Sequence, residues 1–202
     1  MHVQPTDLDG VLVITPVLHG DERGSFAETF RADLFQEAVG HPFTLAQANT
    51  STSRRGVVRG VHFALVPPGQ AKYVQCPAGR ILDLVIDLRT GSPTYAAHVA
   101  VELDDQRRQA LYIPEGYGHA FCALSDRATL HYLCSTPYAP EREFAVHPLD
   151  PELALPWPPD IAPTLSARDA AAPTLAEAAG LGQLPTYAAA QAHRAVLRGA
   201  GG

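Results

Sequence analysis

Lysine is almost absent from this chain of 202 residues: fourteen of its fifteen basic residues are arginine, and only Lys72 is lysine. An ammonium differs from a guanidinium in geometry and in how readily its pKa shifts, so the one retained lysine indicates a position where an ammonium is needed. The chain also lacks basic runs, since the pairs 54–55 and 107–108 stand alone and the net charge is -6. This composition excludes a nucleic-acid-binding surface.

Cysteine is scarce as well, and Cys76, Cys122 and Cys134 form no CxxC pair. Each lies in an apolar stretch, which indicates small buried thiols in a reducing compartment. No apolar run reaches membrane-spanning length, and residues 1–5 show no signal-peptide pattern. We therefore expect a cytoplasmic protein with neither membrane nor nucleic-acid partners.

Motifs for metals and cofactors are missing despite nine histidines. There is no HExxH motif and no HxH followed by a nearby glutamate, so no metal is expected. The chain also lacks a glycine-rich phosphate loop after a strand and a GxSxG elbow. The sequence predicts chemistry performed by side chains alone, without a cofactor.

Glycine and proline are plentiful, with 16 and 18 residues, and they separate short β-branched or alternating runs. Regular short strands without helices between them indicate an antiparallel sandwich or jelly roll. We predict a single domain over residues 1–202, with a β core at about 10–150. The predicted strands are 11–15, 44–50, 57–63, 72–76, 80–88, 98–103, 110–113, 119–124 and 129–135.

Helical patterns are confined to two regions. An apolar stripe over 30–38 ends at Gly40 and predicts a short helix. The C-terminal region at about 160–200 is alanine-rich and predicts helices after Pro173 and Pro185. Ser166 and Asp169 have the spacing of an N-terminal helix cap.

Polar residues cluster within the predicted strands, and each has a structural explanation when taken alone. A lone strand histidine is more often a hydrogen-bonded core or surface residue, and the polar row at 47, 49 and 51 fits either a solvent face or a cavity wall. The order of the motifs is more specific. They are DERGSFAE at 21–28, QANTSTS at 47–53, GVVRGVHF at 56–63, QAKYV at 70–74, DLRTGSPT at 87–94, IPEGYGHAF at 113–121, YLCS at 132–135 and LSARD at 165–169.

This ordered set, from about residue 10 to 185, resembles the dTDP-4-dehydrorhamnose 3,5-epimerase family, a metal-free branch of the cupin jelly rolls that works as a homodimer. The resemblance implies inversion of C3 and C5 of a dTDP-4-keto-6-deoxyhexose by removal and return of protons beside the C4 ketone. It implies that His62 is the general base, that Asp169 orients it, that Lys72 stabilises the enolate and that Tyr132 is the acid on the opposite face. For Asp169 the alternative is a helix-capping role alone.

The resemblance also implies a set of residues that bind the nucleotide sugar. Arg23 and Arg59 match diphosphate ligands, since arginine suits that group. Phe26 and Tyr138 would stack on thymine, and some contacts would come from the partner subunit. The remaining matching positions are Glu28, Gln47, Asn49, His119, Glu143 and Arg168.

Two features depart from simple expectations. Arg59 and His62 have opposite parity in a strand, so we predict an irregularity at Gly60.

Ala64 stands where rhamnose-pathway members carry glutamine, and with residues 67–70 it resembles the branch that makes antibiotic deoxysugars. Three functions therefore remain open: a 3,5-epimerase, a 3- or 5-mono-epimerase of an antibiotic pathway, and a non-catalytic sugar-nucleotide-binding cupin.

Overall fold

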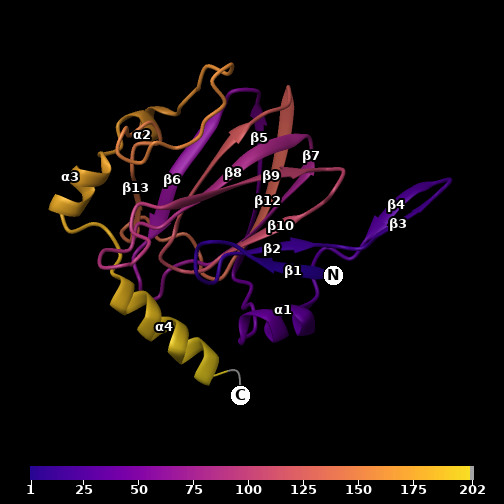
Figure 1. Cartoon of the computed structure of the whole chain (residues 1–202), viewed down its shortest axis with the longest axis horizontal. Coiled ribbons are helices and arrows are strands. Elements are labelled where there is room, and N and C mark those ends of the chain that lie inside the picture. The colour runs from indigo at the N-terminus through magenta and orange to yellow at the C-terminus, as the bar shows by residue number, and fades with distance from the viewer. Residues whose placement is uncertain (201–202) are drawn as a thin grey trace.

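Two antiparallel sheets face each other in the computed structural model, which describes residues 1–200 (Figure 1). The strand order is β1-β2-β10-β7-β12-β5 in the six-stranded sheet and β13-β6-β11-β8-β9 in the five-stranded sheet. The strands of the first sheet are β1 (His2–Pro5), β2 (Leu12–Thr15), β10 (Ala110–Ile113), β7 (Lys72–Ala78), β12 (Arg127–Cys134) and β5 (Gln47–Arg54). Those of the second are β13 (Glu143–Ala145), β6 (Val58–Ala64), β11 (Gly118–Ala123), β8 (Arg80–Ile86) and β9 (His98–Asp104). The prediction of a mainly β antiparallel fold is confirmed.

All nine predicted strands exist, with ends that differ by a few residues at most positions. The sequence patterns did not predict β1, β13 and the hairpin of β3 (Leu18–Asp21) and β4 (Gly24–Ala27). These strands have three or four residues each, and the hairpin is exposed along nearly its whole length, so no alternation of apolar and polar residues marks it. The hairpin extends away from the two sheets (Figure 1).

Three apolar layers hold the sheets together. The inner layer lies between the sheets and includes Val74, Leu111, Val85 and Phe121. A second layer covers the outer face of the five-stranded sheet, where strand residues such as Leu84 pack against the C-terminal region. A third covers the outer face of the six-stranded sheet. Because β8 is covered on both sides, its Asp83 is buried, and Asp87 directly after the strand is buried too; neither has exposed surface.

The helices form where the sequence predicts them. Helix α1 (Ala32–Val39) ends at Gly40, whose φ of 88° suits a left-handed C-cap, and it packs on the six-stranded sheet. The C-terminal helices are α2 (Ala167–Ala170), α3 (Leu175–Gly180) and α4 (Tyr187–Gly199). None of the helices within residues 1–200 is long and apolar enough to cross a membrane.

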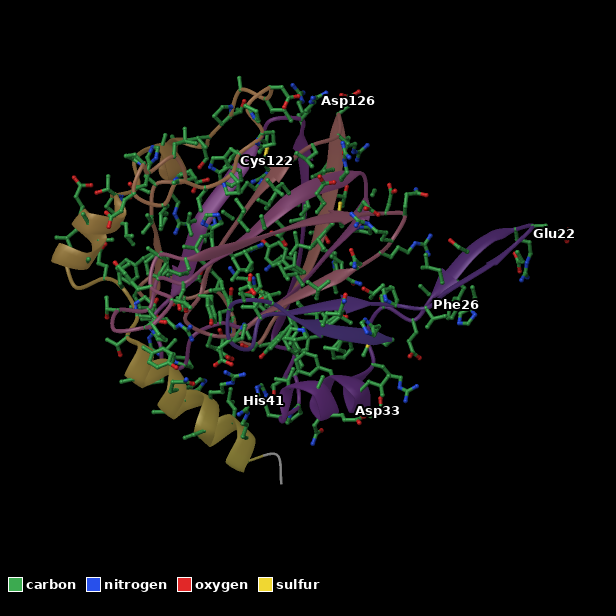
Figure 2. All side chains as sticks on the ribbon, in the orientation of Figure 1. Glu22, Phe26, Asp33, His41, Cys122 and Asp126 are labelled. Atoms are coloured by element: carbon green, nitrogen blue, oxygen red, sulfur yellow. The ribbon has the colours of Figure 1, made fainter. Side chains whose placement is uncertain are left out.

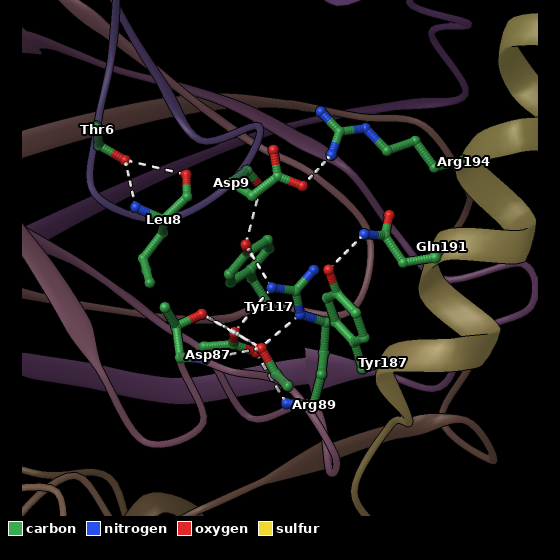
Figure 3. A network of polar contacts seen from close by, with 11 residues as sticks. Thr6, Leu8, Asp9, Asp87, Arg89, Tyr117, Tyr187, Gln191 and Arg194 are labelled. Carbon is green, nitrogen blue, oxygen red and sulfur yellow. Dashed lines mark hydrogen bonds and ion pairs between the residues drawn. The ribbon is translucent and has the colours of Figure 1, made fainter.

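A buried ion pair directly after β8 lies beside the first residue of α4 (Figure 3). Arg89 donates to Asp87 at 2.7 and 2.8 Å, and its guanidinium lies between the Tyr117 and Tyr187 rings at 3.9 and 5.1 Å. Arg194 of α4 adds an ion pair with Asp9. Burial alone would raise the pKa of Asp87, but the hydrogen bonds from Arg89 and two hydroxyls lower it. The DLRTGSPT motif at 87–94 therefore anchors the C-terminal helix.

Candidate active site

A pocket of about 310 Å³ opens between the two sheets. The six-stranded sheet supplies one wall through β5, β7 and β12, and β6 and β13 supply the other. The lining residues are Gln47, Asn49, His62, Gln70, Lys72, Tyr132, Tyr138, Glu143 and Arg168. Gln47 and Asn49 of the polar row on β5 therefore belong to a cavity wall, whereas Ser51 does not line this pocket. Eight of these nine residues belong to the predicted site.

A β-bulge at Gly60 aims the side chains of β6. His119 on β11 is opposite His62, and Phe121 is opposite Arg59, so two β6 residues face one residue of β11. A Cβ at Gly60 would lie 2.5 Å from the Ala120 Cβ, and its φ is 124°. Only glycine fits this position. The predicted irregularity is confirmed, and it places Arg59 and His62 on the same face of β6 despite their opposite parity.

His62 and Asp169 form a dyad in which the imidazole Nε2 donates to the carboxylate Oδ1 over 2.7 Å. Ser166 caps α2 by accepting the Asp169 N–H at 3.0 Å, so the carboxylate itself is free to face His62. The bulge contributes too, because the Gly60 N–H donates to the same carboxylate. Burial would raise the pKa of Asp169, but the hydrogen bond from His62 and the other donors lower it. An ionised Asp169 thus keeps Nδ1 of His62 as the free, basic nitrogen.

Lys72 and Tyr132 line the opposite wall of the same pocket. Burial lowers the pKa of the Lys72 ammonium, although Cys134 and two carboxylates oppose the shift. The ammonium is therefore a stronger proton donor than an exposed lysine. Burial also raises the pKa of Tyr132, which keeps its hydroxyl protonated at neutral pH.

His119 lies next to His62 on the neighbouring strand but does not line the pocket. It is buried, and its Nε2 bonds Asp83 Oδ1 at 2.5 Å. Asp83 was not among the predicted site residues. The only sign of it in the sequence is an acidic residue in an otherwise apolar strand. Arg59 is exposed, and its Nε donates to Ser53 at 3.1 Å.

Three predicted binding residues lie outside the pocket, on or beside the β3–β4 hairpin. The Arg23 side chain is 85% exposed and pairs with Asp21. Phe26 is 69% exposed and lies on the hairpin away from the sheets (Figure 2). Glu28 is half exposed and lies 3.8 Å from Arg31. Within one chain the fold does not bring these side chains to His62.

Gln70 is the one lining residue that the predicted site omitted. It precedes β7 and has the same parity as Lys72, so the alternation of a strand could have indicated it.

Within residues 1–200, no three His, Cys, Asp or Glu side chains lie together as a metal-binding cluster. The side chains present offer an oriented base, an ammonium and a phenol around one cavity. This set suits proton transfer to and from carbon.

Comparisons with known proteins agree with this geometry. A family model described as dTDP-4-dehydrorhamnose 3,5-epimerase matches residues 5–177. A dTDP-4-dehydrorhamnose 3-epimerase from Streptomyces niveus is 55% identical over 192 residues, which cover 95% of this chain and 92% of that protein. A dTDP-4-dehydrorhamnose 3,5-epimerase from Mycolicibacterium smegmatis is 52% identical over 198 residues, 98% of each chain.

A solved structure shares the fold. It is that of ChmJ, a 3'-monoepimerase from Streptomyces bikiniensis, in complex with dTDP-quinovose. Its TM-score to this chain is 0.94 at 49% identity, over 98% of this chain and 99% of ChmJ. The chain is therefore a cupin-type jelly roll, and it belongs to the dTDP-4-dehydrorhamnose 3,5-epimerase family.

Proposed function

We propose that this protein is an epimerase that inverts C3 and C5 of a dTDP-4-keto-6-deoxyhexose. The observation that carries the proposal is the His62–Asp169 dyad facing the same pocket as Lys72 and Tyr132. A ketone at C4 acidifies the hydrogens on C3 and C5, because the resulting carbanion is an enolate. Such a reaction needs a base, a donor at the ketone oxygen and an acid on the other face.

The proposed steps follow from these positions. His62 Nδ1 removes the C3 or C5 proton, and Asp169 stabilises the imidazolium that forms. The Lys72 ammonium donates to the developing enolate oxygen. Tyr132 then returns a proton from the opposite side, which inverts the centre. The lowered pKa of Lys72 and the protonated state of Tyr132 support these roles.

One base can serve both centres. In the chair of a 4-keto-6-deoxyglucose, the hydrogens on C3 and C5 are axial and point to the same face.

The second candidate is a mono-epimerase, favoured by relatives of that type at similar identity: 55% for a 3-epimerase and 52% for a 3,5-epimerase.

The test is proton NMR of dTDP-4-keto-6-deoxyglucose incubated with the protein in D₂O. Deuterium entry and inversion at both C3 and C5 are expected. Exchange at one position only would replace the proposal with a mono-epimerase. Binding of dTDP without exchange at either position would indicate the non-catalytic binding protein and contradict the proposal.

We also propose that the protein acts as a homodimer in which the β3–β4 hairpin completes the partner's site. The exposed Arg23 and Phe26, distant from their own pocket, support this arrangement. A mixing experiment tests it: an Arg23→Ala variant has an intact base, and a His62→Asn variant has an intact hairpin. Mixed dimers would hold one complete site, so an equal mixture should recover about a quarter of wild-type activity. No recovery in dimers shown to have exchanged subunits would contradict the arrangement.

The other binding assignments are part of this proposal: Glu28, Gln47, Asn49, Arg59, His119, Tyr138, Glu143 and Arg168. So is a single domain over residues 1–202. The three free, buried cysteines support the cytoplasmic location we propose.

A further inference from the structure

The segment 136–142 lies between β12 and β13 without helix or strand structure, and its Tyr138 lines the pocket. Tyr138 is 52% exposed, so little packing holds its ring in place. Hydrogen bonds hold the backbone on either side of it instead. Three of these bonds come from side chains that line the pocket.

Two of these bonds act on consecutive backbone N–H groups. Gln47 Oε1 accepts from Tyr138 at 2.8 Å, and Glu143 Oε1 accepts from Ala139 at 3.1 Å. The Gln47 amide is itself oriented, because its Nε2 donates to Asn49 Oδ1 at 2.9 Å. In this arrangement the carbonyl oxygen of Gln47 faces the segment and its amino group does not.

Gln70 holds the beginning of the segment. Its Nε2 donates to the Thr136 carbonyl at 3.1 Å, and the Thr136 hydroxyl donates to the Gly69 carbonyl at 2.8 Å. Gly69 is itself held in place, because its N–H donates to the Leu65 carbonyl at 3.0 Å. The two bonds therefore tie the segment to a fixed part of the fold.

We propose that Gln70 is a positioning residue that acts through Tyr138, and that Gln47 and Glu143 share this role. Together they hold the Tyr138 ring against the pocket, where a nucleotide base stacks on it. This inference rests on the proposed function, which supplies the nucleotide. Ordering the segment before binding reduces the entropy lost when the ligand arrives, so the effect falls on affinity. None of the three bonds involves His62 or Asp169, so the rate of proton transfer is unaffected.

The experiment measures dTDP affinity by calorimetry and exchange in D₂O at saturating substrate. Gln70→Leu removes the donor without adding a charge beside Lys72. It should weaken dTDP binding about five- to tenfold while kcat stays within about twofold. Gln109→Leu is the matched control, because Gln109 also donates through its Nε2, to the Thr15 hydroxyl at 2.9 Å, but lies outside the pocket. It should leave both quantities unchanged.

A double-mutant cycle with Tyr138→Ala separates positioning from direct contact. If Gln70 acts through Tyr138, Gln70→Leu has less than about a twofold further effect once the ring is gone. The same five- to tenfold loss in both backgrounds, or a fall in kcat, would show direct contact with the ligand and overturn the inference. Absence of dTDP binding by the wild type would also overturn it. Failure of the proposed function is distinct, since the wild type would then bind dTDP without exchange.

Discussion

Replacing Asp169 by asparagine tests the base with the smallest change in shape. The carboxylate accepts from both His62 and the Gly60 backbone N–H, whereas an asparagine has only one oxygen to accept with. The Gly60 donor is fixed, but the imidazole can change tautomer, so the oxygen stays with Gly60 and the amino group faces His62. Nε2 then accepts, and the proton moves to Nδ1, the nitrogen that should be basic.

The expected loss is the contribution of a correctly oriented general base, roughly 10²- to 10⁴-fold in the rate of exchange. This corresponds to about 3 to 5 kcal/mol of barrier. The assay is deuterium entry at C3 and C5 by NMR, with dTDP affinity as the check that the pocket is intact. Thr174→Ala is the control: it removes the cap of the neighbouring helix α3, away from the dyad, at a cost of about 1 kcal/mol of stability and should change exchange less than threefold. Exchange within tenfold of wild type in Asp169→Asn would refute the tautomer argument.

Three further predictions follow from the geometry. Tyr132→Phe should lower the rate of inversion about 100-fold while deuterium exchange at the same carbon continues, because only the acid on the opposite face is lost. Product stereochemistry by NMR measures inversion, and an equal loss of inversion and exchange would contradict the role of Tyr132. Gly60→Ala should lower the free energy of unfolding by about 2 to 4 kcal/mol in urea, because the new Cβ meets Ala120 and φ is positive; a loss under 1 kcal/mol would mean that the bulge relaxes. Arg89→Met should cost about 3 to 5 kcal/mol, because it leaves Asp87 charged and buried without its partner. Because the folded protein lowers the pKa of Asp87, its ionised carboxylate stabilises the fold above pH 3.8, and this contribution is lost as the pH falls further. The loss of unfolding free energy caused by Arg89→Met should therefore become smaller in acid.

The sequence predicted the fold where its patterns are strong. Strands 80–88 and 110–113 were found because they are apolar or alternating and turn residues bound them. Helix α1 was found from its apolar stripe and its terminal Gly40. The β3–β4 hairpin was missed because its strands bury almost nothing, so no hydrophobic period exists to read.

The interior polar groups show the limit of strand patterns. Asp83 and Asp87 share a strand face that looks half solvated, yet both are fully buried. Their partners, His119 and Arg89, come from another strand and from the turn after β8. Polar alternation identifies a face but does not say whether water or another side chain lies against it.

The sequence alone determined the chemical groups of the site and the likeness of its ordered motifs to one family, since residue types and their order are properties of the chain. Only the tertiary structure decided which groups meet. His62 and Asp169 are 107 residues apart, and their contact depends on the Gly60 bulge and on the packing of α2. The same holds for Gln70, and for Arg23 and Phe26, which lie far from their own pocket. Contacts between distant segments follow from how sheets and helices pack, and residue type alone does not specify that packing.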